Sequence, residues 1–316
     1  MNIKSRKVVV VGTGAVGSGF AFALAQSGVA EEIVLVDVNA TLAKGQALDL
    51  AHGAPFYPTV DIHEGTAPDA YRDAAVVVIT AGKAQAGPNQ TRLDLLQVNA
   101  KIVTGVVQDV QQVNPTAIVL IVSNPVDVIT HVTQARTQWP MGRILGSGTV
   151  LDSARFRWLL AARYGVSAKN VHALIMGEHG DSEIAAWSIV NIGGVPLTDY
   201  CMSQGKCDLE AHRSEILEQV RRSAYHIIDY KGSTSFGVAM AMTHIVSAIL
   251  RNTRQIMTVS APLTGQYGLS DVTLGVPCVV GANGIEQIPE VKLAKEELEA
   301  LQHSAAILKD SVAQLS

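Results

Sequence analysis

Short apolar runs alternate with longer helical segments along the first half of the chain. The runs are residues 8–11, 33–37, 75–80, 117–122 and the weaker 143–146. Strands so uniformly apolar are typical of a parallel sheet that helices cover on both faces. The segments between them, residues 15–27, 40–50, 92–113 and 126–137, have helix-forming patterns. Repeated β-α-β units of this kind predict a doubly wound α/β domain over residues 1–146.

The second half of the chain has a different pattern. It predicts helices at residues 151–164, 209–230, 235–252 and 290–312, with short strands at 171–176, 185–190, 195–197, 257–260 and 273–280. Helices and strands that do not alternate regularly predict an α+β domain over residues 147–316. The chain has no internal repeat, low-complexity tract or long linker, and we therefore expect the two domains to pack tightly.

The N-terminal segment also has features of a targeting signal. Lys4, Arg6 and Lys7 precede residues 8–30, which carry no charge, as in a signal peptide. Five glycines interrupt this stretch, however, whereas a membrane-spanning helix needs about 20 strongly apolar residues. We therefore expect a buried strand followed by a closely packed helix, and no association with a membrane.

The composition is that of a folded protein of about two domains. Of the 316 residues, 48% are hydrophobic and 16% are charged, which excludes a disordered chain. Twenty-four Lys and Arg against 28 Asp and Glu give a net charge of −4, without the basic run that nucleic-acid binding requires. Cys201, Cys207 and Cys278 match neither a disulfide framework nor a zinc site. We expect free thiols, a reducing cytoplasmic location and no metal.

A glycine motif marks the candidate cofactor site. Gly12, Gly14 and Gly17 form the pattern G-x-G-x-x-G directly after the first predicted strand and at the start of a helix. In this context the motif binds a dinucleotide, because the free N–H groups and the dipole of the helix N-terminus attract its pyrophosphate. Asp37 ends the second strand, 20 residues after Gly17. A carboxylate there accepts hydrogen bonds from the ribose hydroxyls and repels a 2′-phosphate, which predicts NAD rather than NADP.

Polar clusters follow several predicted strands, where the ligands of open α/β sheets bind. They are GEHGD at 177–181, LDSAR at 151–155, NP at 124–125 and a loop at 82–92 whose glycines and proline suit a lid. Oxidation of an alcohol by NAD requires a base, and His179 is the best placed of the nine histidines. Whether Asp152 reaches His179 depends on the fold.

Seven motifs occur in order between residues 12 and 241: GTGAVG, LVDVN, TAGKAQAGPNQTRLDLLQ, SNPVD, GSGTVLDSARFR, GEHGDSE and KGSTSFGVAM. Together they resemble the L-lactate/malate dehydrogenase family, and in particular its bacterial L-lactate branch, over essentially the whole chain. The resemblance implies a Rossmann-type doubly wound parallel sheet followed by an α+β substrate domain. It also implies NAD as the cofactor and the interconversion of pyruvate and L-lactate.

The resemblance assigns roles to individual residues. His179 would be the proton donor or acceptor, Asp152 would orient its ring, and Arg155 would clamp the substrate carboxylate. Arg92 would polarise the substrate carbonyl when the lid closes. The other implied substrate contacts are Asn124, Gln85 and Thr234, and the implied cofactor contacts are Gly12, Gly14, Val16, Gly17, Asp37, Gly82, Val122, Asn124 and Ser147. Taken singly, Asp152 also fits a helix N-cap, and the two arginines also fit a solvated helix face.

One lid residue separates lactate from malate enzymes in this family. Malate enzymes place an arginine there, because the second buried carboxylate of the substrate needs a counter-charge. The lid from Gly82 to Arg92 is one residue longer than expected, so this position is Gln85 when aligned from the left and Ala86 when counted back from Arg92. Neither is cationic, which favours pyruvate over oxaloacetate. An Ala86 that faces the substrate would admit longer aliphatic 2-keto acids.

Arg157 and His172 match the arginine and histidine with which activated bacterial L-lactate dehydrogenases bind fructose 1,6-bisphosphate across a subunit interface. Two cationic residue types suit a ligand with two phosphates, and we expect this effector to activate the protein. Assembly into a homotetramer is a further implication of the resemblance.

Two alternative functions stay open. One is a malate or broad-specificity L-2-hydroxy acid dehydrogenase. The other is a non-catalytic protein that binds NAD or serves a structural role, because fold alone does not determine function. Such a protein has no need to keep Arg92, Asp152, Arg155 and His179 together, and the presence of all four argues against it.

Overall fold

A computed structural model describes residues 6–83, 92–205 and 209–315, and the first half of the chain forms a parallel sheet in it. The spatial order of its strands is β3 (Asp61–Glu64), β2 (Glu32–Val36), β1 (Lys7–Val11), β4 (Val76–Ile79), β5 (Ile118–Ile121) and β6 (Ile144–Gly146). This is the order 3-2-1-4-5-6 of a Rossmann-type doubly wound sheet, which confirms the predicted fold class. The order reverses between β1 and β4, where such sheets bind dinucleotides.

The connections of this sheet are mostly helices. They are α1 (Ala15–Ser27), α2 (Ala40–His52), α3 (Arg92–Val113) and α4 (Val126–Thr137). Three of them have the predicted bounds, and α2 continues two residues past its predicted end. The chain leaves α1 through Gly28, whose φ of 62° suits glycine, and it enters α2 through Asn39, whose side chain accepts the N–H of Leu42.

The strand β3 was not predicted from the sequence. It reads Asp-Ile-His-Glu and lies at the edge of the sheet, where only Ile62 is buried. A strand that has one neighbour and packs through a single apolar side chain lacks the apolar run that identifies the central strands.

The sheet continues into the second half of the chain. The strands β12 (Gln255–Thr264), β13 (Ser270–Gly281) and β14 (Gly284–Gln287) are antiparallel, and β12 joins β6 where Ser260 pairs with Gly146. Within the described residues the sheet therefore has nine strands. The two predicted strands at 257–260 and 273–280 lie inside β12 and β13, and they tie the second half of the chain to the first.

The rest of the second half is helical with very short strands. Its elements are α5 (Val150–Tyr164), β7 (Val171–His172), β8 (Ile175–Met176), β9 (Ile184–Ala185), β10 (Asn191–Ile192), β11 (Val195–Pro196), α6 (Leu197–Ser203), α7 (Leu209–Lys231), α8 (Phe236–Arg251) and α9 (Lys295–Ala313). The predicted strand at 171–176 is thus two strands, β7 and β8. The loop between β8 and β9 contains His179.

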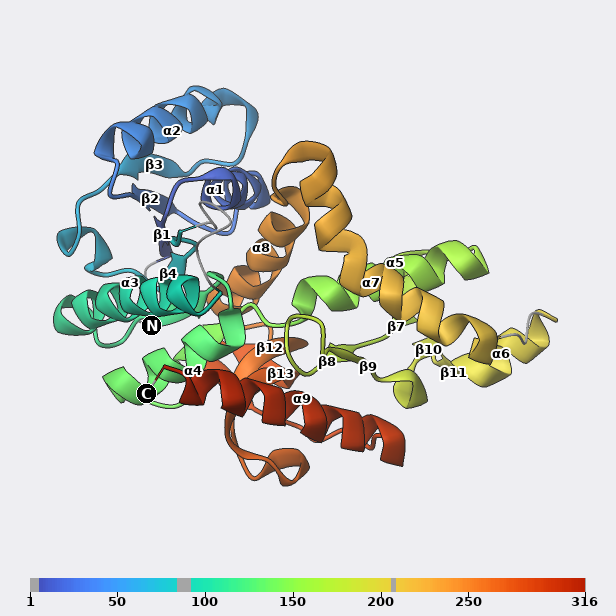
Figure 1. The fold of residues 1–316 in the computed structure, drawn as a ribbon. Coiled ribbons are helices and arrows are strands. Elements are labelled where there is room, and N and C mark those ends of the chain that lie inside the picture. The colour runs from blue at the N-terminus through green and yellow to red at the C-terminus, as the bar shows by residue number, and fades with distance from the viewer. Residues whose placement is uncertain (1–5, 84–91, 206–208, 316) are drawn as a thin grey trace.

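Helices cover both faces of the large sheet (Figure 1). On one face α1 packs against α8, and on the other α3 packs against α4 and α4 against α9. One continuous core surrounds the sheet, and a smaller core around Phe156, Leu160 and Val220 lies between α5 and the neighbouring helix α7. This second core fixes α5, the helix that carries Asp152 and Arg155.

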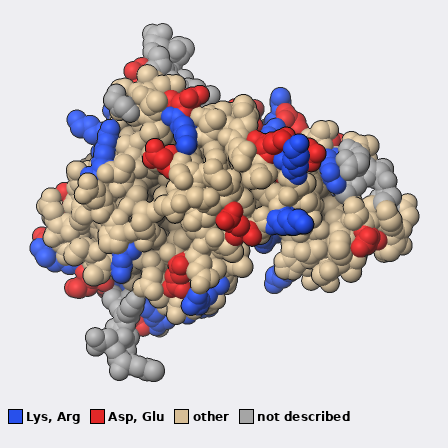
Figure 2. Space-filling view, turned by 90° about the horizontal axis from the view of Figure 1, so that it is seen from below, with Lys and Arg blue, Asp and Glu red and all other residues tan. Residues whose placement is uncertain are grey.

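Charged side chains on the face seen in Figure 2 form small groups of mixed sign, separated by wide uncharged areas. Within the described residues, every helix is too short or too polar to cross a lipid bilayer.

Candidate active site

The loop between β1 and α1 requires two of its three motif glycines for packing. Gly12 has a φ of 94°, and a Cβ on it would lie 2.6 Å from the main-chain nitrogen of Ala81, which follows β4. A Cβ on Gly17 would lie 1.9 Å from the carbonyl oxygen of Gly12. A Cβ on Gly14, in contrast, would meet no described atom within 4 Å apart from those of its two chain neighbours. The loop thus packs closely on its inner side and leaves open space at the N-terminus of α1, which fits the pyrophosphate of a dinucleotide.

Asp37 lies beside this loop, at the carboxyl end of β2. Its Oδ2 accepts hydrogen bonds from the main-chain nitrogen of Thr13 at 2.7 Å and from Thr13 Oγ1 at 3.1 Å, and its Oδ1 accepts one from the nitrogen of Asn39 at 2.9 Å. Partial burial acts to raise the pKa of Asp37, but these hydrogen bonds outweigh it and hold the pKa below its usual value. The group is a carboxylate at neutral pH, as ribose recognition requires.

The other predicted cofactor residues lie along the same edge of the sheet. Val16 is half-buried in the first turn of α1, and Gly82, Val122 and Ser147 follow β4, β5 and β6. Gly82 packs against Asn99, whose Oδ1 accepts the N–H of Lys83 at 2.8 Å. The carbonyl oxygen of Asn124 accepts a hydrogen bond from Asn99 Nδ2 at 3.1 Å, while Asn124 itself is exposed. The predicted residues thus line the carboxyl ends of consecutive parallel strands.

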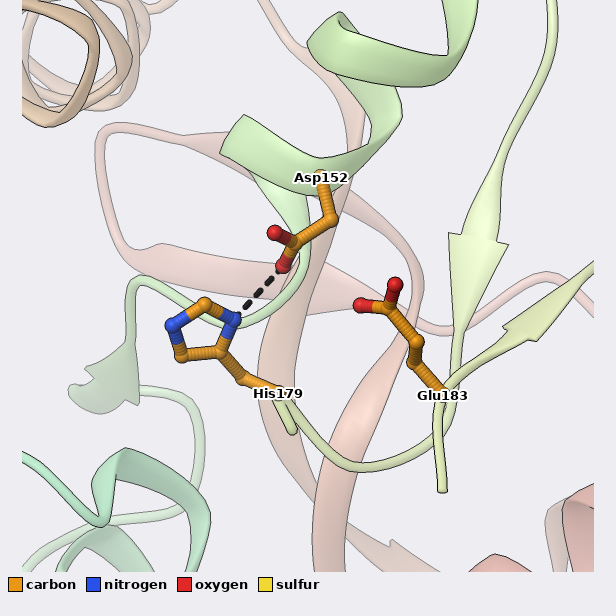
Figure 3. Close-up of side chains that lie close together, drawn as sticks. All are labelled: Asp152, His179 and Glu183. Atoms are coloured by element: carbon orange, nitrogen blue, oxygen red, sulfur yellow. Dashed lines mark hydrogen bonds and ion pairs between the residues drawn. The ribbon is translucent and has the colours of Figure 1, made fainter. Parts of the chain in front are cut away.

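His179 and Asp152 meet at this edge, although 27 residues separate them in the chain (Figure 3). Nδ1 of His179 and Oδ2 of Asp152 are 2.6 Å apart, a short hydrogen bond. Asp152 lies in the first turn of α5 and is 2% exposed, and a quarter of the His179 side chain is accessible. The hydrogen bond fixes which ring nitrogen faces the carboxylate and leaves Nε2 for a ligand.

The charges of this pair stabilise one another. The charge of Asp152 raises the pKa of His179 to about 9 against the opposing effect of burial. Burial acts to raise the pKa of Asp152, but His179 and Arg155 together hold it below its usual value. The stable form at neutral pH is therefore an imidazolium paired with a carboxylate, which is ready to donate a proton.

Arg155 lies three residues after Asp152 on the same face of α5. Its Nη1 donates to Oδ1 of Asp152 at 2.6 Å, and 13% of its side chain is exposed. This places a guanidinium, which has five N–H donors, beside the proton-donating histidine. The arrangement is suited to hold a small carboxylate next to a group that exchanges a proton.

Two family models match the chain end to end. One, the lactate/malate dehydrogenase NAD binding domain, matches residues 6–146, and the other, the lactate/malate dehydrogenase alpha/beta C-terminal domain, matches residues 149–316. The chain belongs to the lactate/malate dehydrogenase family.

Relatives of known name agree with this assignment. An L-lactate dehydrogenase of Treponema denticola is 52% identical over 319 residues and covers 100% of both chains. One from Thermoanaerobacter pseudethanolicus is 48% identical, over 98% of this chain and 99% of its own. Among solved structures, the minor L-lactate dehydrogenase from Enterococcus mundtii in a ligands-bound form has a TM-score of 0.95 at 40% identity, over 99% of each chain.

Other predicted residues of this family member lie around the site or outside the described parts. Thr234 is half-buried just before α8, and Arg92 is the first residue of α3. Gln85 and the neighbouring lid position Ala86 lie outside the described residues. The substrate-selecting role predicted for this position therefore stays a prediction.

The two residues predicted for the effector lie on neighbouring elements, Arg157 in the middle of α5 and His172 on β7. The Nε of Arg157 donates to the carbonyl oxygen of Ala173 at 3.0 Å, and His172, the residue before Ala173, is exposed on β7. The arginine and the histidine predicted for the effector are therefore close neighbours in space.

Two buried acids of the site were missed by sequence reasoning. Asp127, in the first turn of α4, accepts the main-chain N–H of His179 at 2.7 Å and the hydroxyl of Ser260 at 2.5 Å. Burial raises its pKa to about 6. The second acid, Glu183, is 2% exposed just before β9. Both belong to motifs quoted above, SNPVD and GEHGDSE, but an acidic residue in a polar motif gives no sign that it is buried.

A metal site is a second possible reading of this cluster. One polar atom from each of Asp152, His179 and Glu183 lies within 4.8 Å of the others. Two ligands of a tetrahedral zinc ion stand about 3.3 Å apart, given bonds of about 2 Å. Nδ1 of His179 and Oδ2 of Asp152 are 2.6 Å apart, which is the distance of a shared proton. The cluster is therefore arranged for proton exchange.

Proposed function

We propose that the protein is an NAD-dependent L-lactate dehydrogenase that interconverts pyruvate and L-lactate. The observation that carries the proposal is the 2.6 Å hydrogen bond between His179 and Asp152, beside the guanidinium of Arg155. It fits a chain whose relatives named L-lactate dehydrogenase match it over its full length.

Bound NADH would supply the hydride, held by the glycine loop and by the carboxylate of Asp37. His179 would supply the proton: with Nδ1 bonded to Asp152, its Nε2–H is the one that donates to the carbonyl oxygen of pyruvate. The raised pKa of His179, about 9, keeps that proton on the ring at neutral pH. In the reverse direction, the neutral ring takes the proton of the lactate hydroxyl.

The two arginines would position and polarise the substrate. Arg155 would bind the carboxylate of pyruvate through two N–H groups, which fixes the keto carbon for hydride transfer. Arg92, at the start of α3, would stabilise the charge that develops on the carbonyl oxygen. Asn124 and Thr234 would complete the pocket, and Gln85 would select a monocarboxylic acid.

Parallel assays of NADH oxidation test this function. We expect a strong preference for pyruvate over oxaloacetate, because neither Gln85 nor Ala86 supplies a cation for a second carboxylate. A preference for oxaloacetate would contradict the proposal. A branched 2-keto acid in the same assay tests whether Ala86 widens the pocket, in which case its rate equals that of pyruvate. Failure of all three acids would favour the non-catalytic alternative.

We also propose a homotetramer that fructose 1,6-bisphosphate activates. The adjacency of Arg157 and His172 supports a phosphate site, since the guanidinium of Arg157 is bonded to the residue next to His172. Light scattering tests the assembly. Activity with and without the effector tests the site, and we expect activation to be lost in Arg157→Gln and His172→Gln. Activation that survives both substitutions would contradict it.

Two further parts of the proposal concern location and domain limits. We propose that the enzyme works in the cytoplasm, because Cys278 is a free thiol inside the protein. Cell fractionation tests this location. We propose residues 1–146 as the NAD-binding domain and 147–316 as the catalytic domain. Limited proteolysis with and without NADH tests this boundary.

A further inference from the structure

Glu183 is a buried acid in the active site to which the proposed reaction gives no role. It follows the loop that carries His179, and its carboxyl group faces the Asp152–His179 pair (Figure 3). Polar atoms of the three side chains lie within 4.8 Å of one another, and only 2% of Glu183 is exposed. The carboxyl group therefore adjoins the pair that exchanges the proton.

Among the residues that the structure describes, the carboxyl group of Glu183 has no directly bonded cationic partner, which a buried carboxylate normally has. Its Oε1 is buried without a hydrogen-bond partner among the described residues. Arg221 of α7 reaches the same residue, but its guanidinium donates to the main-chain oxygen of Glu183 at 2.6 Å. A buried carboxylate without a direct partner is costly, and the group avoids the cost by holding a proton.

The charged groups around Glu183 come from three elements. Asp152 and Arg155 face it from α5, His179 from the preceding loop and Arg221 from α7. Burial and the negative charge of Asp152 raise the pKa of Glu183, and the three cations oppose the rise only in part, so the pKa is about 8. Glu183 is therefore a neutral acid at pH 7, next to an imidazolium.

We propose that Glu183 is a positioning residue that acts through the Asp152–His179 pair and sets the pH at which His179 gives up its proton. The inference rests on the proposed lactate dehydrogenase function and adds a residue to it. As the pH rises, Glu183 ionises before His179 does. The new carboxylate then stabilises the imidazolium, and His179 keeps its proton to a higher pH than Asp152 alone would allow.

The test is the pH profile of kcat/KM for pyruvate in Glu183→Gln. Glutamine has nearly the same shape but does not ionise, and so we expect the alkaline limb to move to lower pH by about 0.5–1 unit. At pH 9 this is a loss of about twofold to fivefold relative to the parent enzyme, with little change at pH 7. Glu183→Asp, which keeps an ionisable group, should restore part of the shift.

The matched control is Asp181→Asn. It removes a carboxylate from the same loop, but Asp181 is exposed, and solvent screens its charge, so the limb should stay in place. Coincident limbs for Glu183→Gln and the parent enzyme would overturn the proposal. An equal loss at every pH, or a limb moved to higher pH, would overturn it as well, because either result points to a role in packing.

A spectroscopic measurement on the unmodified enzyme covers the case in which Glu183→Gln does not fold. With ¹³C-labelled glutamate, infrared spectra should show a protonated carboxylic acid at pH 7 that disappears as the pH rises through about 8. The band would come from Glu183, because burial raises its pKa to about 8. Spectra without such a band would overturn the proposal.

An inactive enzyme would not leave the inference untested. If the parent protein does not reduce pyruvate, the proposed function fails, but the pKa of the His179 ring remains measurable by NMR of ¹³C-labelled histidine. That pKa should be lower in Glu183→Gln than in the parent protein. Equal pKa values would overturn the role of Glu183 independently of the reaction.

Discussion

The main-chain nitrogen of His179 donates a hydrogen bond to Oδ2 of Asp127 at 2.7 Å, across 52 residues of sequence. Asp127 is 2% exposed and lies in the first turn of α4, the helix that follows β5 in the chain. The other oxygen of the same carboxylate accepts the hydroxyl of Ser260 in β12 at 2.5 Å. One buried acid thus connects the cofactor-binding half of the sheet, the antiparallel extension and the loop that holds the histidine.

The ionisation of Asp127 should be visible in the pH dependence of stability. Burial raises its pKa from 3.8 to about 6, so the folded protein holds this proton more tightly than the unfolded chain does. This tighter proton binding stabilises the folded state. Its contribution to the free energy of unfolding is fully present below about pH 4 and is lost as the pH rises through 6. Relative to Asp127→Asn, the unfolding free energy of the parent should therefore fall by at most about 3 kcal/mol between pH 4 and 6.

Urea unfolding at several pH values and one protein concentration measures this difference. Asp229→Asn, which neutralises an exposed carboxylate on α7, is the control and should run parallel to the parent. A difference between Asp127→Asn and the parent that does not vary with pH would show that Asp127 is ionised throughout, contrary to the expectation.

Replacement of Asp152 by asparagine should lower the pKa of the histidine. The charge of Asp152 is the main reason that the pKa of His179 is about 9 rather than 6.5. In Asp152→Asn the alkaline limb of kcat/KM for pyruvate should move toward pH 6.5. At pH 8 the loss should be at least ~10²-fold, because the general acid is then mostly deprotonated and less well oriented. A limb that stays near 9 would assign the raised pKa to another group.

The sequence predicts those features of the fold that depend on residues close together in the chain. The helices α1, α3 and α4 have the predicted bounds because apolar runs and turn residues mark their ends within a few positions. The pairing of β12 with β6 was not predicted, since an apolar run shows that a strand is buried but not which strand lies beside it. The split of 171–176 into β7 and β8 is likewise a result of tertiary packing.

The same distinction applies to the site. The glycine loop and Asp37 are predictable from residues that lie close together in the chain. The partnership of Asp152 with His179 was implied by family resemblance alone, because a separation of 27 residues hides it from any local pattern. For Asp127 and Glu183, neither a local pattern nor the resemblance predicted a role in the site. Acidic residues in polar motifs are usually exposed, and only the fold reveals these two as buried.

Replacement of Arg155 by lysine should weaken substrate binding more than cofactor binding. Lysine keeps the charge but loses the planar fork that binds a carboxylate through two N–H groups. It also weakens the hydrogen bond to Asp152. A lost hydrogen bond between charged groups costs about 1.5–3 kcal/mol, so KM for pyruvate should rise about tenfold to a hundredfold. The affinity for NADH, measured by fluorescence, should be unchanged.

Arg222→Lys is the matched control for this substitution. Arg222 lies on the exposed side of α7 and pairs with Glu218, one turn earlier on the same helix. Its replacement should change neither the KM for pyruvate nor the affinity for NADH. An Arg155→Lys enzyme with an unaltered KM for pyruvate would remove Arg155 from the substrate site.

The two glycines Gly14 and Gly17 should respond oppositely to replacement by alanine. A Cβ on Gly17 would lie 1.9 Å from the carbonyl oxygen of Gly12, so the loop and α1 must move apart. We expect Gly17→Ala to lower the unfolding free energy by about 1–3 kcal/mol even without cofactor. Apart from its chain neighbours, a Cβ on Gly14 meets no described atom within 4 Å, so Gly14→Ala should fold with the stability of the parent.

The added methyl group of Gly14→Ala enters the space at the N-terminus of α1 that the pyrophosphate would occupy. We therefore expect its affinity for NADH to fall at least about tenfold, while thermal unfolding without NADH is unchanged. Thermal shift assays with and without NADH compare both variants in one experiment. If Gly14→Ala binds NADH like the parent, the cofactor does not approach the backbone at Gly14. The glycine motif would then serve packing alone, as Gly12 and Gly17 do.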